Sequence, residues 1–173
     1  MPFTPFHLGP GLLLKAAAPN RISFTAFAAT QVAVDCEPLY NLLRQQWPVH
    51  RQLHSMAGGT AVGLVVAAAT VAGRPVLNRI LGRVASPDSE SRPLLSAESS
   101  GAGAAIGGVV GGVSHSILDG IMHSDVHPLW PVSAANPLFA LVGLGAVQVG
   151  CVLAAVAGVA CLWLGQTRRR LVV

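Results

Sequence analysis

Charged residues are scarce in this sequence. Of its 173 residues, 10% are charged and 52% are apolar, and the mean hydropathy is +0.58. A typical soluble domain has about 25% charged residues, so the composition argues against an ordinary soluble protein and favours an integral-membrane protein. The length suits a single domain that covers residues 1–173.

Cysteine and aromatic residues are also few. The three cysteines, Cys36, Cys151 and Cys161, have no CxxC spacing, which argues against a disulfide framework or a thiolate metal site. Cys151 and Cys161 lie in an apolar run and are predicted to be small core residues. The eleven lysines and arginines give a net charge of +4, but no basic stripe alternates with aromatic side chains, so no nucleic-acid partner is expected.

Two targeting or binding signals are missing as well. The N-terminus, MPFTPFHLGPGLLLK, has no basic region before its apolar stretch, so it does not resemble a removed signal peptide. The run GAGAAIGG lacks the third glycine and the preceding strand of a dinucleotide-binding loop. Its glycines at Gly103, Gly107 and Gly111 form a repeated GxxxG pattern, which predicts close packing between membrane helices.

Long apolar runs are what the sequence does contain. The clearest are residues 138–164 and 57–73, which carry no charge and are near the ~20 residues that cross a bilayer core. Gly101–Met122 is a third candidate. Two shorter runs, residues 6–18 and 22–34, are separated by a Pro-Asn turn and predict a short helical hairpin. We expect an all-α, integral-membrane helical bundle of about four to five helices.

The distribution of positive charge predicts how the chain is oriented. Residues 74–100 form a polar segment with four arginines, in which Val76, Leu77, Ile80, Leu81 and Val84 share one face of a surface helix that a Ser/Pro/Glu linker follows. Lysine and arginine near span ends favour the cytoplasm. This places residues 74–100, 168–170 and the turn at 15–21 inside. The segments left outside are the N-terminus with His7 and residues 35–54 and 123–136.

Histidines and carboxylates gather in those external segments. The stretch from Gly111 to Pro131 holds three of the six histidines, and His115, Asp119 and His123 recur every four residues, so they share one helix face. We expect Pro128 to end this helix, with Asp125 and His127 folding back over the site. Upstream, His50 and His54 repeat the same spacing, and Asp35 and Glu37 follow an apolar helix.

Imidazoles and carboxylates without thiolates suit a catalytic zinc, manganese or iron centre better than a structural zinc site. The alternative is a structural network in which polar side chains only join helices. Ionisable groups at membrane depth are costly and tend to be functional, and all six histidines fall in or beside one external layer. The pattern therefore favours a metal site.

Four motifs, MPFTPFHLGPGLLLK, DCEPLY, HRQLHS and SHSILDGIMHSDVHPLWP, occur in this order between apolar helices. In this arrangement the chain resembles the YdjM-like family of membrane-bound, metal-dependent hydrolases, which includes a LexA-regulated protein of the inner membrane. The resemblance covers most of residues 1–131. It implies a bacterial or archaeal membrane protein with a helical core and a hydrolase activity whose substrates are largely unassigned. We expect a multi-pass protein of the inner membrane.

A weaker similarity is to zinc-dependent phospholipase C and its nuclease relatives. Those enzymes use a near-N-terminal histidine, an early aspartate, a middle histidine and a His-xxx-Asp pair, matched here by His7, Asp35, His54, His115 and Asp119. The similarity implies that these five side chains are metal ligands. There is no second His-xxx-Asp pair beyond Asn136, so we expect one or two zinc ions rather than three.

Metal-assisted hydrolysis of a phosphoester fits these residues, with membrane lipid or a small or lipid-linked molecule as the partner. His50, His123 and Asp125 are the candidates for proton transfer, for a second metal or for supporting the ligands. Arg51 is a candidate contact for a substrate anion or a lipid headgroup. Trp47 and Trp130 mark the membrane interface or stack on substrate. His127 belongs to the same substrate-facing group. The rival functions are metal transport and a purely structural membrane role.

Overall fold

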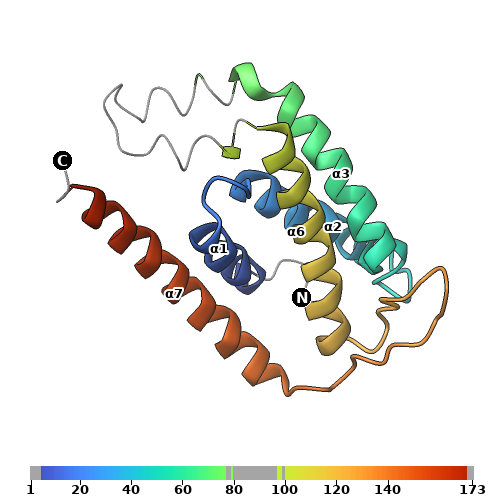
Figure 1. Cartoon of the computed structure of the whole chain (residues 1–173). Helices are drawn as coiled ribbons and strands as arrows, with labels where there is room; N and C mark the ends of the chain where they lie inside the picture. The colour runs from blue at the N-terminus through green and yellow to red at the C-terminus, as the bar shows by residue number, and fades with distance from the viewer. Residues whose placement is uncertain (1–4, 77–78, 80–96, 99, 171–173) are drawn as a thin grey trace.

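The computed structural model describes residues 5–76, 79, 97–98 and 100–170 (Figure 1). All regular structure in these ranges is helical, which confirms the predicted all-α class. The elements are two 3-10 helices, η1 (Pro5–His7) and η2 (Gln52–His54), and the α-helices α1 (Leu8–Ala17), α2 (Phe24–Leu43), α3 (Met56–Ala72), α6 (Gly101–Met122) and α7 (Leu144–Arg170).

Helices α3 and α6 lie side by side and pack through glycine (Figure 1). A Cβ added to Gly112 would overlap the carbonyl oxygen of Gly59, and one added to Gly63 would overlap that of Gly108. The backbones therefore touch directly, as small residues allow when helices pack within a bilayer. A second glycine stripe on α6 faces α2, where Gly107 meets Ser23.

Helix α2 is longer than the sequence predicts. The apolar run ends at Val34, but the helix continues to Leu43, and Asp35 and Glu37 lie within it rather than in an external loop. The buried face continues at helical spacing through polar side chains, so a search for apolar residues stops too early. The buried positions are Ala26, Phe27, Thr30, Gln31, Val34, Asp35, Pro38 and Asn41.

Helix α6 has the predicted bounds, but it ends before Pro128. His123 follows the last turn in an extended conformation. The Asn136 side-chain amide donates to the carbonyl oxygens of Gly120 and His123, which satisfies acceptors at the helix end. Residues 123–136 therefore fold back against α6 instead of extending it.

Among the described residues, two helices are long and apolar enough to cross a membrane, α6 and residues 144–165 of α7. The predicted start of the last span at residue 138 is wrong by six residues, because residues 137–143 form turns before α7. In α7 only 17% of the most apolar stretch is buried. Helix α3, with 17 residues, is a shorter apolar helix. Membrane crossing by α1, α2 or α3 stays a prediction.

A buried ion pair lies beside the turn between α1 and α2. The charge rule uses Lys15 to place the turn at 15–21 on the cytoplasmic side, but the Nζ of Lys15, near the end of α1, is 2.9 Å from Glu98 Oε1 and both side chains are buried. Glu98 also accepts hydrogen bonds from Ser23 Oγ and from the Phe24 and Thr25 amides at the start of α2. The end of the polar segment is thus part of the folded core, because it satisfies donors of the α2 terminus.

The predicted surface helix and the two cysteines of the last apolar run have different outcomes. Most of the predicted surface helix, including Leu77, Ile80, Leu81 and Val84, lies outside the described residues. Cys151 is buried as predicted, whereas Cys161 is exposed on α7. The exposed face of α7 explains this difference, since only a small part of that helix packs against the rest of the chain.

Candidate metal centre

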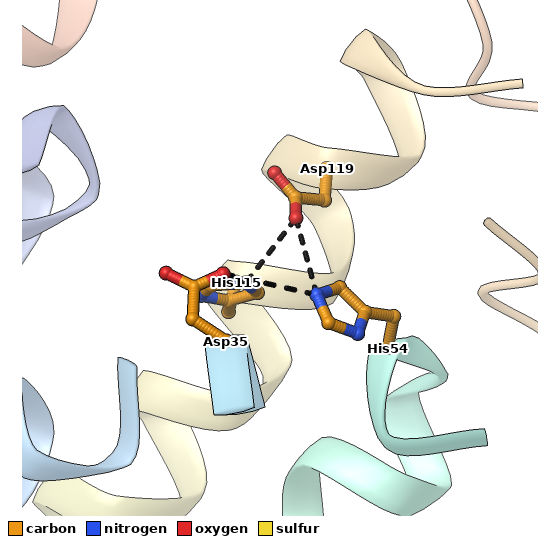
Figure 2. Close-up of side chains that lie close together, drawn as sticks. All are labelled: Asp35, His54, His115 and Asp119. Carbon is orange, nitrogen blue, oxygen red and sulfur yellow. Dashed lines mark ion pairs between the residues drawn. The ribbon is translucent and has the colours of Figure 1, made fainter. Parts of the chain in front are cut away.

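Three elements bring four side chains together at one end of the bundle. Asp35 comes from α2, His54 from η2, and His115 and Asp119 from successive turns of α6, and Figure 2 shows all four pointing toward one another. Each offers one nitrogen or oxygen atom, and these atoms lie within 4.8 Å of one another. All four residues are buried, and together they could hold a metal ion.

The separations that involve Asp119 Oδ2 or His115 Nε2 are close to those of ligands around a small cation, whereas the Asp35–His54 separation is longer. Asp119 Oδ2 is 3.2 Å from His115 Nε2 and 3.4 Å from His54 Nε2. Asp35 Oδ1 is 3.4 Å from His115 Nε2 and 4.0 Å from His54 Nε2. Tetrahedral zinc with ligand atoms at 2.0–2.2 Å would hold neighbouring ligand atoms about 3.3 to 3.6 Å apart.

A glutamine fixes the tautomer of His115. Gln31 Nε2 donates to the Gly111 carbonyl oxygen and to Ser114 Oγ, so its Oε1 faces the imidazole and accepts from His115 Nδ1 at 2.6 Å. Nδ1 therefore carries a proton, and Nε2 faces the two carboxylates. This outer hydrogen bond is typical of a histidine that binds a metal.

The Glu37 carboxylate fixes the orientation of the His54 ring. Its Nδ1 donates to Glu37 Oε2 at 3.0 Å, and Glu37 also accepts from the Arg51 and Leu53 amides. Although burial acts in the opposite direction, these hydrogen bonds lower the pKa of Glu37, so it stays ionised. Burial opposes a charge on His54, but the Asp119 and Glu37 carboxylates outweigh it and raise the pKa of His54. A cation bound at Nε2 would replace a proton there.

His7 approaches the other oxygen of Asp119. Its Nε2 is 3.5 Å from Asp119 Oδ1, its ring meets that of His115 edge to face, and its side chain is buried. Burial lowers the pKa of His7 to about 4 despite the nearby Asp119 carboxylate, so the imidazole is neutral at pH 7. His123 Nε2 is 4.0 Å from the same Oδ1. Each oxygen of Asp119 thus faces two imidazole nitrogens.

A second group lies beside the first. His50 Nδ1 donates to Asp125 Oδ1 at 2.9 Å, and the His50 ring stacks on that of His123. His50 also meets His54 edge to face, with ring centroids 4.8 Å apart. Burial and the neighbouring His54 lower the pKa of His50 although Asp125 opposes this. The candidate proton-transfer residues therefore adjoin the buried group through imidazole contacts.

The two predicted substrate contacts line one pocket. Its volume is about 230 Å³, and its walls are Pro48, His50, Arg51, Gln52, His127 and Trp130. Trp47, which the sequence groups with Trp130, is not part of this wall and is 74% exposed. His50 belongs both to the pocket wall and to the histidine group, so the pocket adjoins the buried site.

Gln31 belongs to the candidate site, and sequence reasoning missed it. It lies in the middle of an apolar run, and its partner His115 is 84 positions away, so no local spacing connects them. A polar residue on the buried face of an apolar helix is the available signal. Glu37 was noticed beside Asp35, but its role as a hydrogen-bond acceptor from His54 depends on the path of the chain after α2.

Comparison with known protein families, with curated proteins and with solved structures found no match. The resemblance to the YdjM-like hydrolases stays a prediction.

Proposed function

We propose that this chain is a membrane-embedded, metal-dependent hydrolase that uses one or two zinc ions to hydrolyse a phosphoester. The observation that carries this proposal is the arrangement around Asp119. The Nε2 atoms of His54 and His115 face two carboxylates and make no hydrogen bond within the described residues. Neutral imidazoles and carboxylates together form a donor set that suits catalytic zinc.

A purely structural network accounts less well for these atoms. In such a network the buried donors and acceptors would pair, because an unpaired buried polar group costs ~1–3 kcal/mol. His7 is the clearest exception, since both ring nitrogens are buried and have no hydrogen-bond partner among the described residues. Three buried imidazoles whose Nε2 atoms face the Asp119 carboxylate without a hydrogen bond among the described residues favour a bound cation.

Transport is supported less than hydrolysis. A transport path predicts ligands at several depths with a site near the bilayer midplane. Instead, ring contacts join His7, His115, His54, His50 and His123 in one continuous group. This group lies at the end of α6 where residues 123–136 fold back. A single layer of ligands suits one reaction site.

The side chains of the site have three roles in the proposed hydrolysis: some bind the metal, some orient the metal ligands, and one transfers a proton. When bound, zinc would lower the pKa of a coordinated water to ~7 and polarise a phosphoryl oxygen. Asp35, His54, His115 and Asp119 would hold it, and Gln31 and Glu37 keep the two imidazoles in the required tautomer. His50, whose Nδ1 proton is held by Asp125, presents its other nitrogen for moving a proton at the leaving group.

The membrane setting rests on α6 and α7, which are long and apolar enough to cross a bilayer. With positive charge inside, the histidine group would face the exterior of the inner membrane. The resemblance to the YdjM-like family agrees with this location. Both the multi-pass topology and the external site belong to the proposal.

The test is turnover of bis(p-nitrophenyl) phosphate and p-nitrophenyl phosphate by the protein in mild detergent. We expect hydrolysis that stops on chelation and returns with zinc or manganese, and no hydrolysis by Asp119→Ala. The matched control is Thr70→Val, whose hydroxyl bonds within α3 away from the site. Turnover that is insensitive to chelation, or equal in Asp119→Ala, would contradict the proposal.

A further inference from the structure

The pocket of Pro48, His50, Arg51, Gln52, His127 and Trp130 lies beside the buried histidine group, which it adjoins through His50. The side chains that would hold the metal are almost fully buried, from 0% exposure for His54 and His115 to 7% for Asp35. A substrate must therefore reach them past residues of the surrounding layer. His50 forms part of the pocket wall and touches the His54 ring, so the pocket adjoins the reaction site.

The polar groups of this pocket favour an anion. Arg51 Nε donates to the Pro48 carbonyl oxygen, and within the described residues no carboxylate forms an ion pair with its guanidinium. The Nη groups of Arg51 can therefore donate hydrogen bonds to a planar or tetrahedral oxyanion. His127 Nδ1 is buried and has no hydrogen-bond partner in the described part of the chain. Both groups are suited to phosphate or phosphonate oxygens.

The size of the pocket limits what fits inside. At about 230 Å³ it lies below the ~300 Å³ at which sites for drug-sized ligands begin. A phosphorylated head can enter, but a larger substrate must leave its remainder outside. The surface next to Trp130 is apolar, since Leu129 and Val132 are 40% and 93% exposed and Trp130 itself is 41% exposed.

We infer that this pocket binds the head of an anionic amphiphile, a phosphoester that carries an alkyl chain, with Arg51 on the anion and Trp130 at the start of the chain. The inference rests on the proposed function and adds the substrate class to it. An exposed tryptophan beside apolar side chains is the arrangement that proteins place at a membrane interface. The chain of the amphiphile would stay in that layer while its head reaches the metal.

The experiment compares the binding of methylphosphonate and dodecylphosphonate to zinc-loaded protein in nanodiscs. The two probes share the anion and differ in the chain, and dodecyltrimethylammonium serves as the probe with reversed charge. We expect dodecylphosphonate to bind at least about tenfold more tightly, which corresponds to 1.4 kcal/mol, after correction for its partition into empty nanodiscs. The cationic probe should not compete.

Four variants separate the contributions. Arg51→Gln should weaken both phosphonates about tenfold, whereas Trp130→Ala should remove only the advantage of the longer chain. The controls Arg44→Gln and Trp163→Ala change an arginine and an exposed tryptophan away from the pocket and should bind as the wild type does. Equal affinity for the two phosphonates would overturn the inference and indicate a water-soluble substrate. Wild-type binding by Arg51→Gln would also overturn it.

Metal content, measured on the same samples, separates this inference from the proposed function. If the wild type binds zinc but shows no preference for the alkyl chain, the amphiphile is wrong and the hydrolase proposal stands. If the wild type binds no zinc under zinc-replete conditions, the hydrolase proposal fails whatever the phosphonates do.

Discussion

At the scale of single residues, the candidate centre depends on hydrogen bonds that decide which imidazole nitrogen is free. Gln31 and Glu37 accept from the Nδ1 atoms of His115 and His54, so both Nε2 atoms face Asp35 and Asp119. Without these acceptors the rings could adopt the other tautomer or rotate. Residues that do not touch a metal would therefore contribute to its affinity.

Glu37→Gln and Gln31→Leu should each weaken zinc binding about 10- to 100-fold without abolishing it. Gln31→Leu removes the acceptor for His115, and Glu37→Gln replaces a charged acceptor for His54 by a neutral one. Competition with a chromophoric chelator measures the affinity. Cys36→Ser, an exposed change on the same helix, is the control. Unchanged affinity in both variants would show that the two hydrogen bonds do not orient ligands.

The spacing of His115 and Asp119 could be predicted from the sequence because four residues make about one turn of a helix. Gln31 could not, because its contact with His115 depends on the packing of α2 against α6. The contacts of Asp119 with histidines outside α6 also depend on packing, because its two oxygens face four histidines from separate segments. Local periodicity predicts which side chains share a face, but not which faces meet.

At the scale of helices, the site is held by the contact between α3 and α6. Glycines at the crossing let the two backbones touch, and His54 and Ser55 directly precede α3. Ser116 Oγ donates to the Ser55 carbonyl oxygen and so connects α6 to the start of α3. The distance between His54 and His115 therefore depends on how closely these helices approach.

Gly112→Ala should destabilise the protein by about 1–3 kcal/mol, the usual cost of overpacking, and should weaken metal binding. A methyl group there would overlap the Gly59 carbonyl oxygen, so the helices must separate. Gly145→Ala is the control because a Cβ at that position meets nothing within 4 Å. Thermal unfolding in detergent gives the stability. Equal melting temperatures for both variants would contradict the close contact.

The Lys15–Glu98 pair makes the free energy of unfolding depend on pH in the acid range. Although burial opposes it, hydrogen bonds from Ser23, Lys15 and the α2 amides lower the pKa of Glu98 below its ordinary 4.5. The stability that this carboxylate contributes is complete above pH 4.5 and is lost as the pH falls through the lowered folded pKa. Glu98→Gln should be less stable than wild type at neutral pH. This difference in stability should shrink as the pH falls below 4.5 and Glu98 becomes protonated in the wild type.

Thermal unfolding midpoints at several pH values would measure this difference between wild type and Glu98→Gln. The double variant Lys15→Met, Glu98→Gln should recover part of the loss, because it removes the buried charge that the single variant leaves without its carboxylate. A difference between wild type and Glu98→Gln that stays constant down to the acid limit would mean that Glu98 stabilises the fold in another way.

The helix bounds could be predicted where composition changes sharply, as for α6 with its preceding serines. They could not for α2, because its buried face changes from apolar to polar without interrupting the helix. The buried state of Lys15 was also beyond prediction, because its partner is 83 positions away. Charge scarcity predicts a membrane protein, but not which of the few charges are buried as pairs.

At the scale of the whole molecule, polar groups occupy both ends of α6. The Lys15–Glu98 pair lies near its start and the histidine group near its end. The helix has 22 residues and is therefore about 33 Å long, close to the thickness of a bilayer core. The charge rule predicted that the histidines gather on one side, and their ring contacts place them together.

Cysteine labelling in intact cells tests this orientation. In a background with the native cysteines changed to serine, Asn20→Cys in the α1–α2 turn and Ala135→Cys in the segment after α6 should react from opposite sides of the membrane. Both positions are exposed. A membrane-impermeant maleimide should label Ala135→Cys only. Labelling of both, before lysis, would overturn the topology while leaving the metal site untested by that result.

The most direct test of the central claim is metal content per folded protein, measured for wild type, His54→Ala, His115→Ala and Asp119→Ala purified with zinc present. We predict at least one zinc per wild-type chain and a loss of the ion bound between these ligands in each variant, because each substitution removes an atom that faces the shared site. The variants should still insert, since insertion depends on the apolar helices. Equal zinc in all four proteins, or none in any of them, would contradict the account and favour a structural polar network.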